Sequence, residues 1–112
     1  MKKFLVLYRM DMGEMKKAMA SMNPEDQKKN MAEWGAWMQK HIASFADAGA
    51  PAGKNTQVSA SGAEQKSNDI GGYSIVQAES QETAVAMLSD SPHLKMPGAT
   101  ADVMELMPMP GM

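Results

Sequence analysis

Cysteine is absent from this sequence, and Arg9 is its only arginine. The lack of cysteine excludes a disulfide framework, a thiolate nucleophile and a cysteine-based zinc site. A nucleic-acid-binding domain needs a basic surface, but this chain has a formal net charge of −2 and a pI of about 5.6. The composition therefore argues against a disulfide-stabilised domain and against a nucleic-acid partner.

Long apolar runs are missing as well. The N-terminal run at residues 4–8 is too short for the apolar region of a signal peptide, and Arg9 and Asp11 follow it closely. No later stretch approaches the length of a membrane-spanning helix. A chain of 112 residues is long enough to build one core. We therefore expect a single domain over residues 1–112, located in the cytoplasm and without a membrane partner.

Residues 70–94 form the stretch around which the rest of the chain is organised. Two glycines followed by aromatic and β-branched residues predict a buried strand, whose bulky positions are Tyr73, Ile75 and Val76. Ser80 is a preferred helix N-cap, and Pro92 ends the helix because it has no N–H group to donate. The predicted apolar stripe of this helix consists of Ala84, Val85, Met87 and Leu88.

The first half of the chain predicts a strand and a long helix. The strand, residues 3–9, is apolar on both faces. Asn23 caps the helix and Pro24 takes its first position, and we expect the helix to reach Ala48 and stop at Gly49. Its predicted buried stripe consists of Met31, Trp34, Met38, Ile42 and Phe45. Residues 10–22, between the strand and this helix, form either a short helix or a mobile flap.

The remaining segments complete a βαββαβ order. Residues 50–54 and 96–98 read as turns, residues 61–69 as a loop or hairpin connection, and residues 56–60 and 101–107 as strands. This order predicts a ferredoxin-like α+β fold. Right-handed crossovers would place both helices on one face of a four-stranded sheet.

The second face of that sheet has no helix to cover it, although it is apolar. The strand at residues 3–9 is apolar on both sides, and Ile75 and Val76 point to opposite faces of its partner. An uncovered apolar face is an interaction surface. A second copy packed sheet against sheet would cover it, so we expect a homodimer with two-fold symmetry.

Several pieces of the sequence resemble the YCII-related proteins, including their DGPF-like branch. The matching pieces are residues 31–34, 37–38, 49–54, 70–80, 91–93 and 103–105. The most specific of them is the Gly-Gly-Tyr strand that leads into Ala-Glu-Ser, together with the Pro-His pair after the helix. The resemblance spans nearly the whole chain and implies ferredoxin-like protomers that pair into a dimeric α+β barrel.

The biochemical activity of that family is mostly unassigned, and an enzymatic role around a histidine and an aspartate is suggested for some members. His41 matches the histidine of the family's first helix. Asp90 lies one place before the aspartate that other members carry directly before proline, where this chain has Ser91. The DGPF tetrapeptide is absent, because residues 61–64 read Ser-Gly-Ala-Glu.

The candidate site follows one flank of the first long helix. Trp37, His41 and Ser44 are spaced by four and three residues, which aligns their side chains beside the buried stripe. A flat or acidic small organic molecule could stack on Trp37 and bond to His41 there. The catalytic candidates are therefore His41 and Asp90, and the binding candidates are Trp37, Ser44, Lys54, Tyr73 and His93.

Plain structural readings stand beside these roles. His41 can equally be a helix-edge histidine bonded to a neighbour, and His93 a histidine that meets the dipole at a helix C-terminus. The fourteen methionines suggest a further alternative, a Cu(I) site built from the thioethers around Met10, Met15 and Met107. Methionine also fills irregular cores and adaptable surfaces, and we expect no metal and no cofactor. Three functions remain open: an enzyme with His41 as acid and base, a non-catalytic binding module, and a copper binder.

Overall fold

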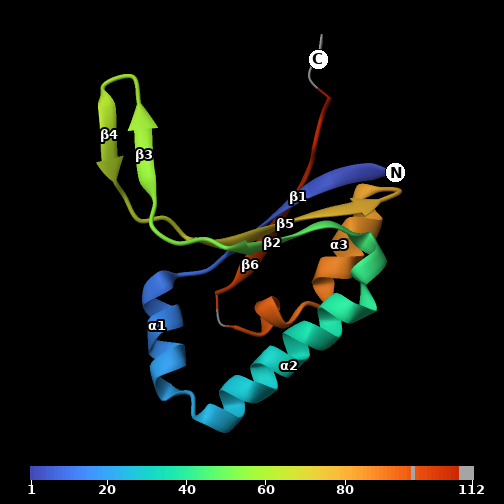
Figure 1. Cartoon of the computed structure of the whole chain (residues 1–112), viewed down its shortest axis with the longest axis horizontal. Helices are drawn as coiled ribbons and strands as arrows, with labels where there is room; N and C mark the ends of the chain where they lie inside the picture. The colour runs from blue at the N-terminus through green and yellow to red at the C-terminus, as the bar shows by residue number, and fades with distance from the viewer. Residues whose placement is uncertain (97, 109–112) are drawn as a thin grey trace.

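The computed structural model describes residues 1–96 and 98–108, and its centre is an antiparallel sheet (Figure 1). The strands follow the order β2–β5–β1–β6, and they are β1 (Lys2–Arg9), β2 (Phe45–Pro51), β5 (Ile70–Ala78) and β6 (Thr100–Glu105). Helices α2 (Pro24–Lys40) and α3 (Gln81–Ser89) lie on one side of this sheet. The arrangement is the predicted ferredoxin-like α+β fold.

The core lies between that face of the sheet and the two helices. Phe4, Val6 and Tyr8 alternate along β1 and are buried, and Val76 faces the same way from β5. Their helical partners in the core are Trp37, Ala84, Met87 and Leu88. Burying a side chain of this size contributes about 2 kcal/mol to folding, so this one face supplies most of the packing energy.

The two predicted helix starts agree with the structure. Asn23 accepts a hydrogen bond from the backbone N–H of Asp26, and Ser80 accepts one from Thr83, as expected for N-caps. The segment at residues 10–22 contains helix α1 (Met12–Ser21), which Asp11 caps. The helical alternative for this segment is therefore confirmed.

The predicted end of the long helix is wrong. Helix α2 ends at Lys40, the short 3-10 helix η1 (Ile42–Ser44) follows, and the chain then enters β2. Pairing with β5 determines this outcome, because Phe45 lies opposite Val76 and Asp47 opposite Ile75. Tertiary pairing has overridden a local preference for helix.

Gly49 shows why the predicted end of the long helix is wrong. Glycine at that position was expected to cap a helix, and it instead sits within β2 at a φ of 77°. A Cβ atom built on Gly49 would lie 1.7 Å from the carbonyl oxygen of Tyr73 on β5. The glycine is needed because the two strands approach closely at an irregular step in their pairing.

The buried stripe of α2 also differs from the prediction. Trp37 is its buried residue, at 5% exposure, whereas Met31 and Ile42 are 74% and 56% exposed. Trp34 and Met38 pack against the core in partly buried positions. The shift follows from the early end of the helix, because α2 meets α3 and the sheet through its last two turns.

The second strand of the sheet is therefore β2, not the segment at residues 56–60. That segment contains β3 (Thr56–Ser59), which pairs with β4 (Gly62–Gln65) in a separate two-stranded hairpin. The hairpin extends from the side of the sheet opposite the helices (Figure 1), and all eight of its strand residues are exposed. Residues 61–69, predicted to be a loop or hairpin connection, instead contain the second strand of this hairpin.

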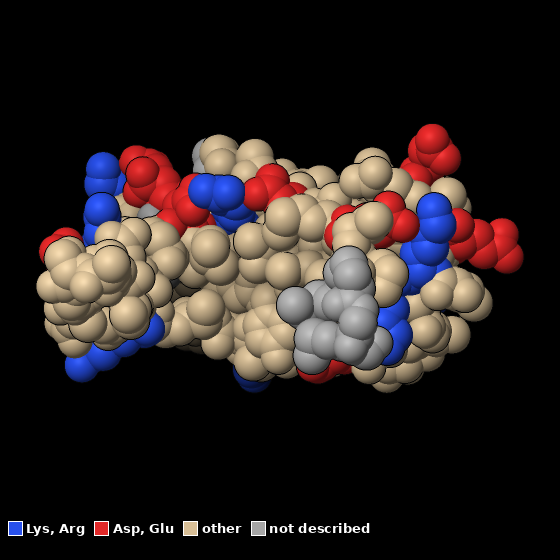
Figure 2. Space-filling model, turned by 90° about the horizontal axis from the view of Figure 1, so that it is seen from above, with Lys and Arg blue, Asp and Glu red and all other residues tan. Residues whose placement is uncertain are grey.

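The outward face of the sheet is apolar at its centre. Leu5 and Leu7 on β1 face away from the helices and lie opposite Ile75 and Tyr73 on β5, and Met104 on β6 extends the row. Figure 2 shows this side of the molecule with a largely uncharged centre and charged residues along its edges. The two-faced apolar character predicted for β1 is thus confirmed.

At the C-terminus, α3 ends at Ser89, before Pro92, as predicted. Pro92 opens a second short 3-10 helix, η2 (Pro92–Lys95), and the last strand follows. The predicted turn at Pro97 and the methionine at position 109 lie outside the described residues. Among the described helices, none is long and apolar enough to cross a membrane.

Candidate functional site

A cavity of about 330 Å³ lies between α2 and one end of the sheet. One wall is aromatic, and its members are Tyr8, Trp34, Trp37 and His93. The other wall consists of small residues, at positions 48–51 of β2 and 71–72 of β5. Aromatic rings facing backbone and small side chains leave a narrow space that suits a flat molecule.

A chain of hydroxyl groups runs along this cavity. The hydroxyl of Tyr8 lies 3.0 Å from Oγ of Ser74, and Ser74 donates to the backbone carbonyl of Ala48 at 2.9 Å. Burial raises the pKa of Tyr8, and the hydrogen bond with Ser74 opposes that shift. Tyr8 is therefore a neutral phenol across the physiological pH range.

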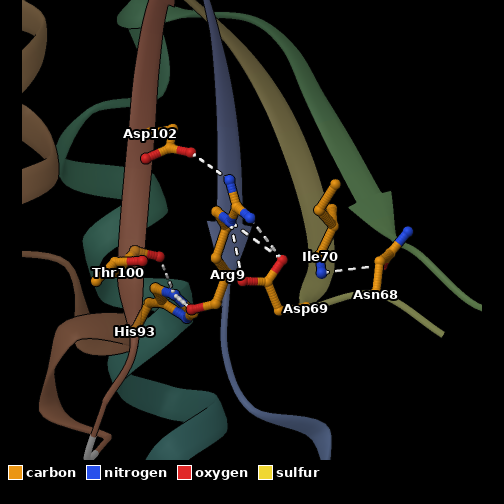
Figure 3. A network of polar contacts seen from close by, with 7 residues as sticks. All are labelled: Arg9, Asn68, Asp69, Ile70, His93, Thr100 and Asp102. Atoms are coloured by element: carbon orange, nitrogen blue, oxygen red, sulfur yellow. Dashed lines mark hydrogen bonds and ion pairs between the residues drawn. The ribbon is translucent and has the colours of Figure 1, made fainter.

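His93 is completely buried and lines the same cavity. Its Nε2 lies 3.1 Å from the carbonyl oxygen of Arg9 and 2.8 Å from that of Thr100 (Figure 3). Carbonyl oxygens only accept, so this geometry assigns the ring proton to Nε2. The opposite nitrogen, Nδ1, is buried and has no hydrogen-bond partner among the described residues.

The strand ends beside the cavity are tied together by Arg9 (Figure 3). Its guanidinium contacts both carboxylate oxygens of Asp69 at 3.1 Å and one of Asp102 at 2.9 Å. Asp69 precedes β5 and Asp102 belongs to β6, so one side chain joins three strands. This network fixes the end of β1, which carries Tyr8 and Met10 into the cavity wall.

Beside the aromatic wall, three side chains from the end of α2 and its C-cap residue meet at Asp90. Trp37 donates its indole N–H to Asp90 at 2.9 Å, and Lys40 donates to the other carboxylate oxygen at 2.7 Å. Nε2 of His41 lies 3.4 Å from Asp90, too poorly aligned for a hydrogen bond. The pKa of Asp90 is lowered, mainly by the hydrogen bond from Lys40, then by Trp37 and the nearby charges of Lys40 and His41.

The structure sorts the predicted site residues into groups. Trp37 and His93 meet in the cavity, and Tyr73 borders it from β5 while its side chain lies on the outward face of the sheet. His41 and Asp90 lie together, on the far side of Trp37 from the cavity, and neither is among its described lining residues.

The other two candidates lie elsewhere. Ser44 belongs to η1, so it does not continue the helical flank that begins with Trp37 and His41. Lys54 lines an exposed hollow at the base of the hairpin, together with Lys16 and Lys66. Neither side chain lines the cavity.

Sequence reasoning missed Tyr8 and Ser74 as site residues. Ser74 had a usable signal, because it is a polar residue on the face of β5 that otherwise carries Val76 and Ala78 into the core. Tyr8 had a weaker one, as the last inward position of an apolar strand. Neither signal says that the two hydroxyls meet, which depends on the register of β1 against β5.

The methionines do not gather into one described cluster. Met10 lines the cavity, and it also lines a neighbouring hollow together with Met15 and Met96. Met107 is 73% exposed. Within the described part of the chain, no group of three or more histidine, aspartate or glutamate side chains is placed to hold a metal ion.

Comparison with known proteins identifies the fold. No family model and no curated protein matches this sequence. A similar solved structure is the 5-chloro-2-hydroxyhydroquinone dehydrochlorinase of Burkholderia phenoliruptrix in complex with 2,5-dihydroxybenzoquinone. The match has a TM-score of 0.59 at 18% identity and covers 94% of this chain and 93% of that one. At this identity the likeness supports the ferredoxin-like fold.

Replacing Asp90 by Asn should change how stability depends on pH. The folded pKa of Asp90 is lowered, so its ionised form stabilises the protein above the ordinary aspartate range, and this contribution is lost as pH falls through the lowered pKa. Asp90→Asn should therefore be less stable than the wild type at neutral pH, with the difference vanishing in acid. Urea unfolding at several pH values measures this, with Glu64→Gln in the exposed hairpin as control. A difference that persists unchanged in acid would contradict it.

Proposed function

We propose that this chain is a cytoplasmic YCII-related protein of the DGPF-like type, which binds a small, flat organic molecule in the cavity between α2 and the sheet. The cavity carries the proposal. Its volume of about 330 Å³ falls at the lower end of small-molecule sites, which are lined by apolar and aromatic groups with a few polar atoms. Trp37 and His93, both singled out from the sequence, lie in its wall, and Tyr73 borders it from β5.

The structural neighbour supports the same proposal. It is a dehydrochlorinase in complex with 2,5-dihydroxybenzoquinone, a molecule built on a single six-membered ring. The two chains align over nearly their full lengths. A ring of that size matches the narrow space between the aromatic wall and the glycine-rich wall of the cavity.

A second candidate is an enzyme in which the cavity is the active site. The observation that favours it is the contact between His41 and Asp90, because a histidine beside a carboxylate is a common acid–base pair. Trp37 separates this pair from the cavity and bonds to Asp90. In this candidate His41 would reach a substrate after a movement of the Trp37 side chain.

We also propose that the protein is a homodimer formed through the outward face of the sheet. Leu5, Leu7, Tyr73, Ile75 and Met104 form an apolar surface there, and no described helix covers it. A two-fold interface uses the same patch from both subunits, and a flat sheet face is well suited to that. A partner on this side would leave the cavity, on the helix side, free to bind its ligand.

Filling the cavity should abolish ligand binding without unfolding the protein. Pro51 lines the cavity, is exposed and lies opposite Gly72, on the face of the sheet that carries Tyr8, so Pro51→Phe places a ring there at little cost to the core. Both tryptophans of the chain line the cavity, and their indole N–H signals in NMR report binding of phenol directly. Phenol should shift both signals in the wild type, with affinity at least about tenfold weaker in Pro51→Phe. Ala46→Phe, outside the cavity on the same strand, is the control; equal binding by both variants would contradict the site.

A charge on the outward face should separate the dimer, whereas a charge in the core should unfold the protein. Ile75→Lys is expected to give a folded monomer, because Ile75 points away from the helices. Val6→Lys buries an unpaired charge between sheet and helices and should cost more than about 3 kcal/mol. Light scattering and circular dichroism distinguish the two outcomes. A monomeric wild type at micromolar concentration would overturn the proposed assembly.

Catalysis is separated from simple binding by following a reaction product. The neighbour's name identifies 5-chloro-2-hydroxyhydroquinone as a first test compound. Under the enzyme candidate, the wild type releases chloride from it and His41→Ala loses at least about tenfold in rate, because the acid–base group is gone. Chloride release that is unchanged in His41→Ala would exclude His41 from the reaction.

A further inference from the structure

We propose that the cavity selects an uncharged aromatic molecule that donates an O–H group, such as a phenol, to the hydroxyl oxygen of Tyr8 and to Nδ1 of His93. This inference rests on the proposed function, in which the cavity binds a small molecule. It adds the charge of the ligand and the direction of its hydrogen bonds. Both follow from the polar groups that the cavity wall contains.

The wall offers no charge to a bound ion. None of the described lining residues is lysine, arginine, aspartate or glutamate. Two charged side chains that adjoin the wall are already paired, Arg9 with Asp69 and Asp102, and Asp90 with Lys40. A carboxylate or phenolate would give up its hydration for an aromatic wall without a counter-charge, which is costly. An uncharged molecule avoids that cost.

The hydroxyl protons of Tyr8 and Ser74 are both already donated within the protein. Ser74 has a single hydroxyl proton, and it donates this proton to the carbonyl oxygen of Ala48. In the contact between Tyr8 and Ser74, the proton must therefore come from Tyr8. The phenol proton of Tyr8 is then engaged, and the oxygen of Tyr8 retains lone pairs that can accept.

The free ring nitrogen of His93, like the hydroxyl oxygen of Tyr8, can only accept a hydrogen bond. Its Nε2 proton is shared between the carbonyl oxygens of Arg9 and Thr100, so the neutral ring offers Nδ1 as an acceptor. That nitrogen is buried and has no partner among the described residues. The ring of His93 lies 5.3 Å from the ring of Tyr8, centre to centre, so the two rings are neighbours in the wall.

The side chains of Tyr8 and His93 thus present acceptors and have no free donor of their own. An unpaired buried acceptor is costly, and a ligand that supplies an O–H removes this cost. A ligand with an ether or ketone oxygen at the same position would face two acceptors and gain nothing. The aromatic wall favours a ring as the remainder of the molecule.

The decisive comparison is between 4-nitrophenol and 4-nitroanisole, which share ring and oxygen but differ in the donated proton. Calorimetry at a pH where the phenol is neutral should give about tenfold tighter binding for 4-nitrophenol. Its affinity should fall as pH rises through its own ionisation, because the anion is rejected. The affinity of 4-nitroanisole should stay constant and so reports any change in the protein itself.

Two variants locate the preference. Tyr8→Phe removes one acceptor and keeps the ring, and His93→Gln keeps a donor towards Arg9 and Thr100 while removing Nδ1. Each should reduce the tenfold preference for the phenol by at least about threefold, whereas Ser89→Ala, an exposed hydroxyl on α3, should leave it unchanged. If one of these two variants fails to fold, the phenol preference measured in the other still tests the inference.

The outcomes separate this inference from the function on which it rests. Equal affinity for the phenol and the anisole, or tighter binding of the phenolate, would overturn the inference and leave the binding site standing. A preference that survives in both Tyr8→Phe and His93→Gln would also overturn it. If neither compound shifts the two indole signals, the binding site and the inference fail together.

Discussion

The hydrogen bond from the indole of Trp37 holds the architecture of the site together. This side chain is buried between α2, α3 and the sheet, and its N–H is shared by the carbonyl oxygen of Met87 and the carboxylate of Asp90. Both acceptors lie at the end of α3, so one indole fixes the position of α2 relative to α3. Losing the bond to Met87 would leave a buried carbonyl on one helix and a buried N–H on the other, at a cost of about 1–3 kcal/mol for each unpaired group. The position of α2 in turn sets the separation between its tryptophans and the sheet.

The cavity is a consequence of that separation. Large aromatic side chains hold the end of α2 away from the strands, and where β2 and β5 carry only glycine, alanine and proline, nothing fills the remaining space. On the other flank, Arg9 and His93 tie the end of β1 to the starts of β5 and β6 from opposite sides of the strand. The cavity is therefore bounded by residues that separate interactions hold in place: Trp37 on one flank, and Arg9 with His93 on the other. Binding to such a preformed site loses little free energy to reorganisation, which favours a small ligand with few contacts of its own.

The sequence predicts the sheet better than it predicts the site. The strands at residues 3–9 and 70–78 carry strong alternation, and the caps at Asn23 and Ser80 are local signals that survive in the fold. The strand β2 was not predictable in this way, because residues 45–51 contain three alanines and a glycine, and only their pairing with β5 makes them a strand. The same limit applies to the site: Trp37 and His93 are visible as residue types, but the meeting of Tyr8 with Ser74 depends on register. His41 was identified by its helical spacing and by resemblance, and spacing alone does not say on which side of Trp37 it lies.

The hairpin β3–β4 is a segment whose amino-acid sequence can vary without disturbing the core. Both of its ends join strands whose residues border the cavity, since Pro51 precedes it and Gly71 follows it, and the backbone bond from Ala52 to Gly71 closes its base. Beyond that base its strands pair with each other and are fully exposed, so their length and composition are free of the packing constraints that bind the sheet. Insertions and substitutions accumulate most easily in such segments. Proteins with this fold could therefore alter the rim of the binding site by changes in the sequence of one exposed hairpin. The residues that contact the ligand would keep their positions, because the core holds them.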